Sequence, residues 1–210
     1  MVAIAENDFQ YIDCFIEDKT LISLLNSISL AKELILLKWI GYHGSMKILE
    51  AIMPLIVNPS LITVFYGACK RNQVNTIRYI KNELCMEELS AGINEACNFN
   101  CWDLVEYLVM HCNRVPGPTI YHASINNKLD IVKILINKPL DEEYIRRSIV
   151  EVSKLGYYEI LKLLLEKSSL LEEPEKTLNM ALEKAKEASH YEVMELLLSK
   201  GGRLILNEKL

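Results

Sequence analysis

The residues best equipped for chemistry lie together in the middle of the chain, at Cys97, Cys101, His111 and Cys112. Thiolate and imidazole groups are common zinc ligands, and a thiolate is also a nucleophile. The spacing does not favour zinc binding, because it contains no CxxC pair of the kind common in zinc sites. Cys97 also occupies the same place in an apolar helical pattern as Cys69. We interpret the cysteines as buried core thiols, and the alternative is a zinc-binding or thiol-dependent enzyme on a helical-repeat scaffold.

The histidines do not complete a catalytic motif. They are scattered through the chain, at His43, His111, His122 and His190. The sequence has no Ser/His/Asp, HExxH, phosphate-loop or dinucleotide-loop spacing around them or elsewhere. We therefore predict no catalytic residue, no metal site, no cofactor and no enzymatic activity.

Composition restricts the class of protein further. The 210 residues carry a formal net charge of -5, with acids and bases interspersed, which gives no electrostatic basis for binding nucleic acid. The opening "MVAIAENDFQ" lacks a basic n-region, and no apolar run is long enough to span a membrane. We expect an intracellular, cytoplasmic protein without disulfides. Eight glycines and six prolines among many Leu, Ile, Glu and Lys residues favour an all-α fold.

The helices that would position any site recur as one pattern along the chain. A Gly, Asn or Ser ends the first helix of each unit, and we call these residues the anchors: Gly44, Asn72, Asn100, Asn127, Gly156 and Ser189. Gly and Asn tolerate the left-handed backbone conformation that closes a helix C-terminus, so their recurrence has a backbone cause. Each unit is predicted to be a helix, a tight turn and a second helix.

Apolar residues keep a fixed distance from the anchors. An apolar residue lies seven positions before each anchor, and a small residue usually lies four before it, as at Ala68 and Ala96. Apolar pairs lie four and five, then seven and eight, positions after the anchor, which predicts one apolar stripe on the second helix. We expect a single domain over residues 1–210 that consists of the following parts: a half-unit 1–16, a connector 17–34, units of about 35–60, 61–88, 89–116, 117–143, 144–172 and 173–202, and a tail 203–210.

Several segments resemble the ankyrin repeat. The second-helix sequences are "DIVKILI" at Asp130 to Ile136 and "YEILKLLLEK" at Tyr158 to Lys167. "PTIYHASINN", residues 118–127, is similar to the TPLHxA segment, and "LLLSKGG", residues 196–202, to a second helix with its glycine cap. The resemblance implies an α-solenoid of stacked helix-turn-helix units. The anchors are mostly 27 to 29 residues apart rather than 33, so we expect short or missing β-turn fingers.

The two positions before each anchor are the candidate binding site. In the family that the chain resembles they lie on the concave face of the stack, and here they include aromatic and cationic residues, which are favoured at protein interfaces. The alternative is that they are ordinary solvated residues of the turns. The predicted partner-binding residues are Tyr42, His43, Lys70, Arg71, Asn98, Phe99, Asn126 and Lys154.

The function that follows is non-enzymatic binding of another protein on the concave face. Stacked helix pairs present an extended curved surface, which suits a macromolecule better than a small ligand. Divergent ankyrin-like units rich in Ile, Asn, Lys and Cys also resemble host-directed proteins of large DNA viruses or intracellular bacteria. That resemblance implies a protein that modulates host signalling or ubiquitination.

Overall fold

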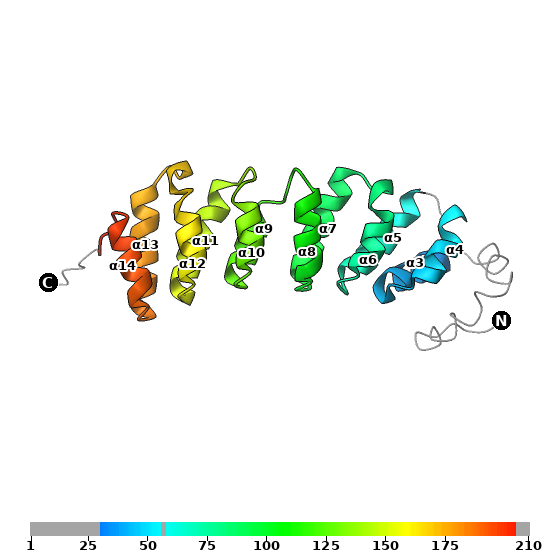
Figure 1. The fold of residues 1–210 in the computed structure, drawn as a ribbon, viewed down its shortest axis with the longest axis horizontal. Helices are drawn as coiled ribbons and strands as arrows, with labels where there is room; N and C mark the ends of the chain where they lie inside the picture. Colours follow the sequence, from blue (N-terminus) through cyan, green and yellow to red (C-terminus); the bar gives the residue numbers. More distant parts are fainter. Residues whose placement is uncertain (1–29, 56–57, 205–210) are drawn as a thin grey trace. The chain divides into compact units, whose positions relative to one another are not determined.

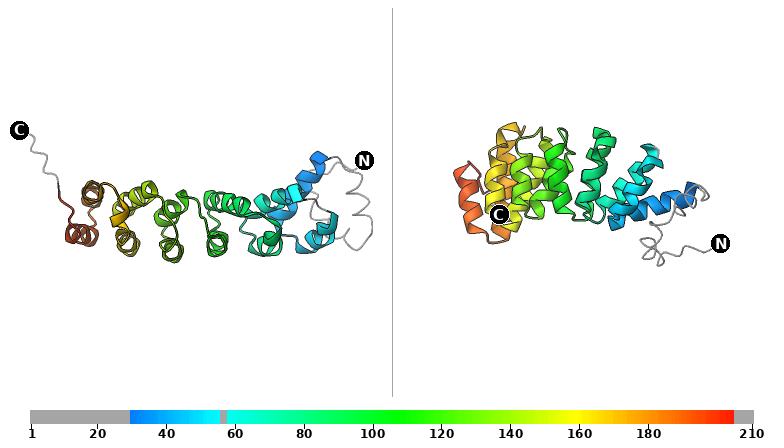
Figure 2. Two further views of the ribbon diagram at one scale, coloured as in Figure 1. Left: turned by 90° about the horizontal axis from the view of Figure 1, so that it is seen from above. Right: turned by 45° about the vertical axis from the view of Figure 1, so that its right-hand side comes forward.

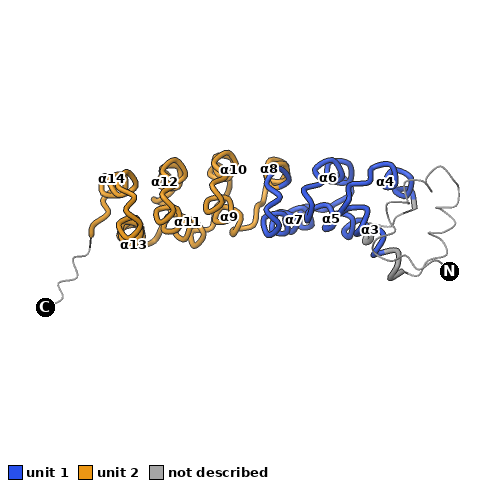
Figure 3. The backbone as a smooth tube through the Cα atoms, turned by 90° about the horizontal axis from the view of Figure 1, so that it is seen from below, with its two compact units in different colours: residues 1–104 blue, residues 105–210 orange. Residues whose placement is uncertain are grey.

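The computed structural model describes residues 30–55 and 58–204. The chain divides into two compact units, residues 1–104 and 105–210, coloured separately in Figure 3. All regular secondary structure in the described residues is helical, with twelve α-helices, three short 3-10 helices and no strand. The expected all-α class is therefore confirmed for this part of the chain. The expected half-unit 1–16 lies outside it.

The first unit contains helical hairpins in which a first helix is followed by a shorter second one (Figure 1). The first helices α3, α5 and α7 pack in sequence, α3 against α5 and α5 against α7. Their bounds, with those of the second helices and 3-10 turns, are α3 (Leu30–His43), α4 (Met46–Ile52), η2 (Met53–Leu55), α5 (Asn58–Cys69), α6 (Val74–Ile80), η3 (Lys81–Glu83), α7 (Met86–Asn98) and α8 (Trp102–His111), the last of which ends in the second unit.

The second unit continues with three hairpins. Its first helices α9, α11 and α13 pack side by side in one row, and its second helices α10, α12 and α14 form another row (Figure 2). The elements are α9 (Pro118–Ile125), α10 (Leu129–Leu135), α11 (Glu142–Leu155), α12 (Tyr158–Leu165), η4 (Ser168–Leu170), α13 (Pro174–Glu187) and α14 (Tyr191–Ser199).

The first helices begin near, but not at, the expected starts of the units. α3 begins at Leu30, inside the connector expected over 17–34, because "LAKEL" consists of strong helix formers. The prediction that residues 30–34 belong to the connector is therefore wrong. Residues 17–29 of the expected connector lie outside the described part. α5 begins at Asn58 and α7 at Met86, each three residues before the expected starts at 61 and 89.

Every anchor adopts the left-handed conformation, which the residue type predicts for the Gly and Asn anchors but not for Ser189. The backbone φ angles are 68° at Gly44, 57° at Asn72, 56° at Asn100, 54° at Asn127, 75° at Gly156 and 61° at Ser189. An L-residue other than Gly, Asn or Asp rarely takes this conformation, because its Cβ approaches the following carbonyl oxygen. The anchors therefore fix where every first helix ends and the chain reverses.

The core consists of the positions that keep a fixed distance from the anchors. All six residues seven positions before an anchor are buried, from Leu37 to Leu182, and so are those four before, including Ile40 and Val152. On the second helices, the residues four, five and eight positions after the anchor are buried, with Met194 half-buried as the exception.

The expected stripe on the second helix is wider than the observed one. The residues seven positions after each anchor are half-buried or exposed, with Tyr79 exposed by 43%. At 100° per residue, positions four, five and eight lie on one face, whereas position seven lies about 100° from its centre. The first member of the second apolar pair therefore lies at the edge of the stripe rather than in the core.

Small residues three positions before the anchors allow the first helices to approach closely. A Cβ on Gly41 would lie 2.0 Å from the carbonyl oxygen of Val64, so α3 and α5 touch through their backbones there. The equivalent residues of the next units are also small and buried: Cys69, Cys97, Ser124 and Ser153. These residues therefore have a packing role.

Within residues 30–55 and 58–204, none of the helices has the length and apolar character of a membrane span.

Candidate functional site

The predicted partner-binding residues lie where each first helix ends and its turn begins. Tyr42 and His43 end α3, Lys70 and Arg71 follow α5, and Asn98 and Phe99 lie at the end of α7. None of the eight predicted residues is buried. The first unit brings six of them to successive turns. Four of these six make cation–aromatic contacts, and Glu95 pairs with one of the cations. We call Tyr42, Lys70, Arg71, Glu95 and Phe99 the turn-end cluster.

Arg71 and Tyr42 form the first contact of the turn-end cluster. The guanidinium carbon lies 4.5 Å from the centre of the Tyr42 ring, which is within the range of a cation–π interaction. The Gln73 side-chain amide donates a hydrogen bond to the Tyr42 carbonyl oxygen at 3.3 Å, a second link between these turns. The His43 ring contacts two other rings of α3: its centre lies 4.4 Å from that of Trp39 and 5.2 Å from that of Tyr42. The end of α3 is therefore aromatic and carries a stacked cation.

Lys70 and Phe99 form the second contact, one hairpin further along. The Lys70 ammonium lies 4.9 Å from the centre of the Phe99 ring and 3.2 Å from the Glu95 carboxylate. Phe99 is nevertheless 47% exposed, which is unusual for a phenylalanine. The cluster thus combines ordered cations with accessible aromatic surface, the composition typical of interface anchors.

The two predicted residues of the second unit lie apart from that cluster. Asn126 is exposed just after α9, and its side-chain amide donates to the His122 carbonyl oxygen at 2.9 Å, on its own helix. Lys154 is exposed in the last turn of α11. The structure therefore offers no contact that joins these two residues into one site.

A further cation–aromatic group in the second unit was missed by the sequence analysis. The Arg147 guanidinium lies 4.8 Å from the Tyr121 ring centre and 5.9 Å from that of Tyr144. Burial, followed by the nearby Arg147 charge, lowers the pKa of His122. These residues lie five or more positions before the anchors, outside the pair of positions that the pattern singled out. The available signal was an arginine on one first helix and a tyrosine on the preceding one.

Four of the five described cysteines lie in the core, as expected. Cys69, Cys97, Cys101 and Cys112 are buried, Cys85 is exposed at the start of α7, and Cys14 lies outside the described residues. Burial raises the pKa of Cys97 to about 12, and it also raises the pKa of Cys69, Cys101 and Cys112. These thiols are therefore protonated near neutral pH, whereas nucleophilic attack and metal binding need the thiolate. In the described ranges no group of three or more His, Cys, Asp or Glu side chains could hold a metal ion.

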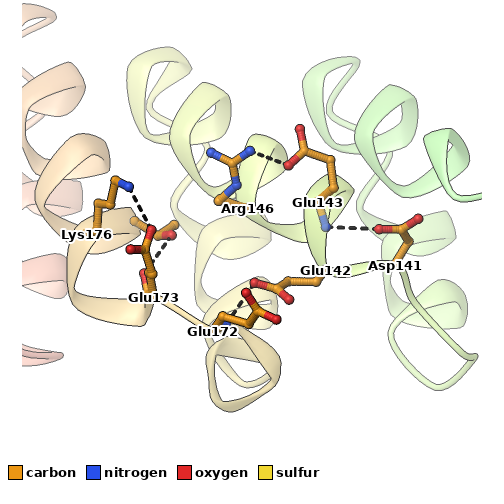
Figure 4. A network of polar contacts seen from close by, with 8 residues as sticks. Asp141, Glu142, Glu143, Arg146, Glu172, Glu173 and Lys176 are labelled. Carbon is orange, nitrogen blue, oxygen red and sulfur yellow. Dashed lines mark hydrogen bonds and ion pairs between the residues drawn. The ribbon is translucent and has the colours of Figure 1, made fainter.

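The second unit also has an acidic recess between the starts of α11 and α13 (Figure 4). Its carboxylates are largely engaged by the protein itself. Glu143 pairs with Arg146, Glu173 pairs with Lys176 at 2.7 Å, and Glu142 accepts a hydrogen bond from the Glu172 backbone N–H at 2.8 Å. Asp141 caps α11 by accepting from the Glu143 N–H at 3.0 Å. The recess is accounted for by helix capping and local ion pairs.

Comparisons with known proteins give no match to this chain. No protein-family model matches it, and no curated protein or solved structure does so either. The function must therefore be argued from the side chains that the fold presents.

Proposed function

We propose that this chain is a non-enzymatic, ankyrin-like scaffold that binds another protein through the turns at the ends of its first helices. The observation that carries the proposal is the turn-end cluster, in which two cations stack on two aromatic rings from successive turns. Such contacts hold long side chains in place before a partner arrives, which lowers the entropy cost of binding.

Two features of the fold support an ankyrin-like arrangement. Each hairpin reverses at a residue in the left-handed conformation, and the first helices within each unit pack against one another in sequence. Stacked hairpins present their turns as a row rather than as an enclosed pocket, and such a row suits an extended macromolecular partner. In the ankyrin-like arrangement that we propose, this row is part of the concave face.

Solvation of ordinary turn residues is the competing explanation for the cluster. Turns usually carry small polar residues, because these satisfy the backbone and interact well with water. The Phe99 side chain has no polar group that could do so, and the core needs neither Phe99 nor Tyr42, since neither is buried. Exposed aromatic side chains that are ordered by cations are the pattern expected of interface anchors.

The proposal is tested by capture of binding partners with matched variants. The surface variant carries Tyr42→Ala, Arg71→Ala and Phe99→Ala. The control variant carries Tyr79→Ala, Met110→Ala and Arg114→Ala, which removes the same kinds of side chain from exposed positions elsewhere. Tagged proteins are used to isolate partners from cells of the source organism or its host, and quantitative mass spectrometry compares them.

We expect proteins that are enriched on the unmodified chain and on the control variant to be lost from the surface variant. Circular dichroism should show that both variants keep their helix content, because none of the six replaced side chains is buried. Equal enrichment on all three proteins, with helix content intact, would refute binding through these turns.

A further inference from the structure

Arg71 has hydrogen-bonding capacity that the described structure does not use. Its guanidinium carries five N–H donors in one plane. In the described part of the chain, the Arg71 side chain stacks on Tyr42, and no carboxylate or carbonyl oxygen accepts a hydrogen bond from it. Stacking covers one face of the guanidinium and leaves the in-plane edge free for a planar acceptor. A carboxylate matches that edge with two parallel hydrogen bonds.

The charges around Arg71 favour an acidic ligand. Lys38 is exposed one helical turn before Tyr42 on the same face of α3, and Lys70 is adjacent to Arg71 in sequence. The nearby carboxylates are already engaged: Glu95 pairs with Lys70 at 3.2 Å, and Asp103 accepts a hydrogen bond from the Asn72 side chain at 2.8 Å. Asn72 is neutral, so Asp103 keeps its charge, and the three cations Lys38, Lys70 and Arg71 outnumber the two carboxylates by one, although the whole chain carries -5.

Phe99 adds an apolar contact on the hairpin that follows Arg71. Phe99 lies against Lys70 and Tyr42 lies against Arg71, and Lys70 and Arg71 are consecutive residues, about 4 Å apart between Cα atoms. Each residue of an extended peptide covers about 3.3 Å. Lys70 reaches the following hairpin and Arg71 the preceding one, so a peptide that contacts both Arg71 and Phe99 must lie along the row of turns.

We propose that the turn-end cluster binds an acidic peptide segment of the partner, in which a carboxylate pairs with Arg71 and a large apolar side chain of the same segment packs on Phe99. This inference rests on the proposed protein-binding function and names the chemistry of the partner. Arg71 supplies charge and bidentate geometry, and Phe99 selects for an apolar neighbour.

Fluorescence polarisation with a labelled synthetic peptide tests this inference directly. The probe is Gly-Asp-Glu-Phe-Asp-Glu-Gly, and the comparison probes are the same peptide with Lys at each acidic position, a neutral peptide with one phosphoserine, and a short single-stranded oligothymidylate. The proteins are the full chain, Arg71→Ala, Arg71→Lys, Phe99→Ala and the control Arg114→Ala, which removes an exposed arginine from the second unit.

We expect the acidic peptide to bind the full chain and to bind Arg71→Ala about tenfold more weakly, because a hydrogen-bonded charge pair is lost. Arg71→Lys should bind at an intermediate level, since it keeps the charge but not the fork geometry. Phe99→Ala should also bind more weakly, and Arg114→Ala should bind normally. Binding should weaken as salt is raised, because these charges are exposed.

Three results would overturn the inference: no binding of the acidic peptide, equal binding of the lysine peptide, or tighter binding of the phosphoserine peptide or the oligonucleotide. After such a result, the partner-capture experiment still tests the proposed function. If the surface variant still loses its partners there, the turns bind a protein of different chemistry. If it keeps them, the proposed function itself has failed.

Discussion

Asn72 links neighbouring hairpins in the first unit, and it makes a quantitative test of how they are held together. Its side-chain oxygen accepts a hydrogen bond from the backbone N–H of Leu104 at 2.9 Å, and its amide donates to Asp103 at 2.8 Å. Leu104 is the third residue of α8, so its N–H has no acceptor within that helix. Asn72 therefore acts as an N-terminal cap for α8, supplied by the preceding hairpin.

The substitution Asn72→Gly removes both hydrogen bonds and keeps the turn. Glycine accommodates the φ of 57° without strain. Loss of a helix cap costs about 1 kcal/mol, and loss of the exposed hydrogen bond to Asp103 costs about 0.5 kcal/mol more. We therefore expect the free energy of unfolding to fall by about 1.5 kcal/mol.

Asn100→Gly is the matched control, because Asn100 has a φ of 56° and lies in the same unit. Its side chain is exposed and makes no hydrogen bond within the described residues, so we expect a change of less than about 0.5 kcal/mol. Both variants are unfolded with urea as full chains and followed by far-ultraviolet circular dichroism. If Asn72→Gly is as stable as Asn100→Gly, with equal denaturant dependence, the cap contributes nothing and the reasoning is refuted.

Three further predictions concern packing and the buried thiols. Gly41→Ala should destabilise the first unit by about 2 kcal/mol in urea unfolding, because the new Cβ would lie 2.0 Å from the Val64 oxygen; an unchanged midpoint would contradict the close approach of α3 and α5. Burial raises the pKa of Cys97 from 9.0 to about 12, so above pH 9 the unfolded thiol ionises while the folded one does not. The free energy of unfolding should therefore fall by up to about 1.4 kcal/mol per pH unit between pH 9 and 12, and Cys97→Ala should reduce this slope. In a Cys14→Ser background, a thiol reagent at pH 8 should label exposed Cys85 well before Cys69 or Cys97, as mass spectrometry of the labelled peptides would show; equal rates would contradict the burial of those two thiols.

The sequence predicts the helices, their turns and most of the core, because these depend on short-range rules. The left-handed turn favours a few residue types, so the conformations of Asn72 and Gly156 can be predicted from their residue types. The helical period then places Leu37 and Phe65, seven positions before their anchors, on the buried face. Both features are determined within about two turns of helix, so no knowledge of distant residues is needed.

The contacts between hairpins could not be predicted in the same way. Arg71 lies 29 positions after Tyr42, and Phe99 lies 29 positions after Lys70, so each pairing depends on how far adjacent hairpins are offset. The pattern identified these residue positions but not which cation stacks on which ring. It also missed Arg147 and Tyr121, because they lie further from the anchor than the pair of positions that the pattern singled out.

The positions just before the anchors differ from the core positions in how strongly packing restricts their residue types. Three, four and seven positions before an anchor, side chains pack against neighbouring helices, and their types are restricted to small or apolar ones in nearly every hairpin. One and two positions before it, no side chain is buried, so packing places no comparable restriction on residue type. Tyr42, Arg71 and Phe99 occupy such positions. Their ordered stacking on accessible rings therefore supports the proposal that these turns bind a partner protein.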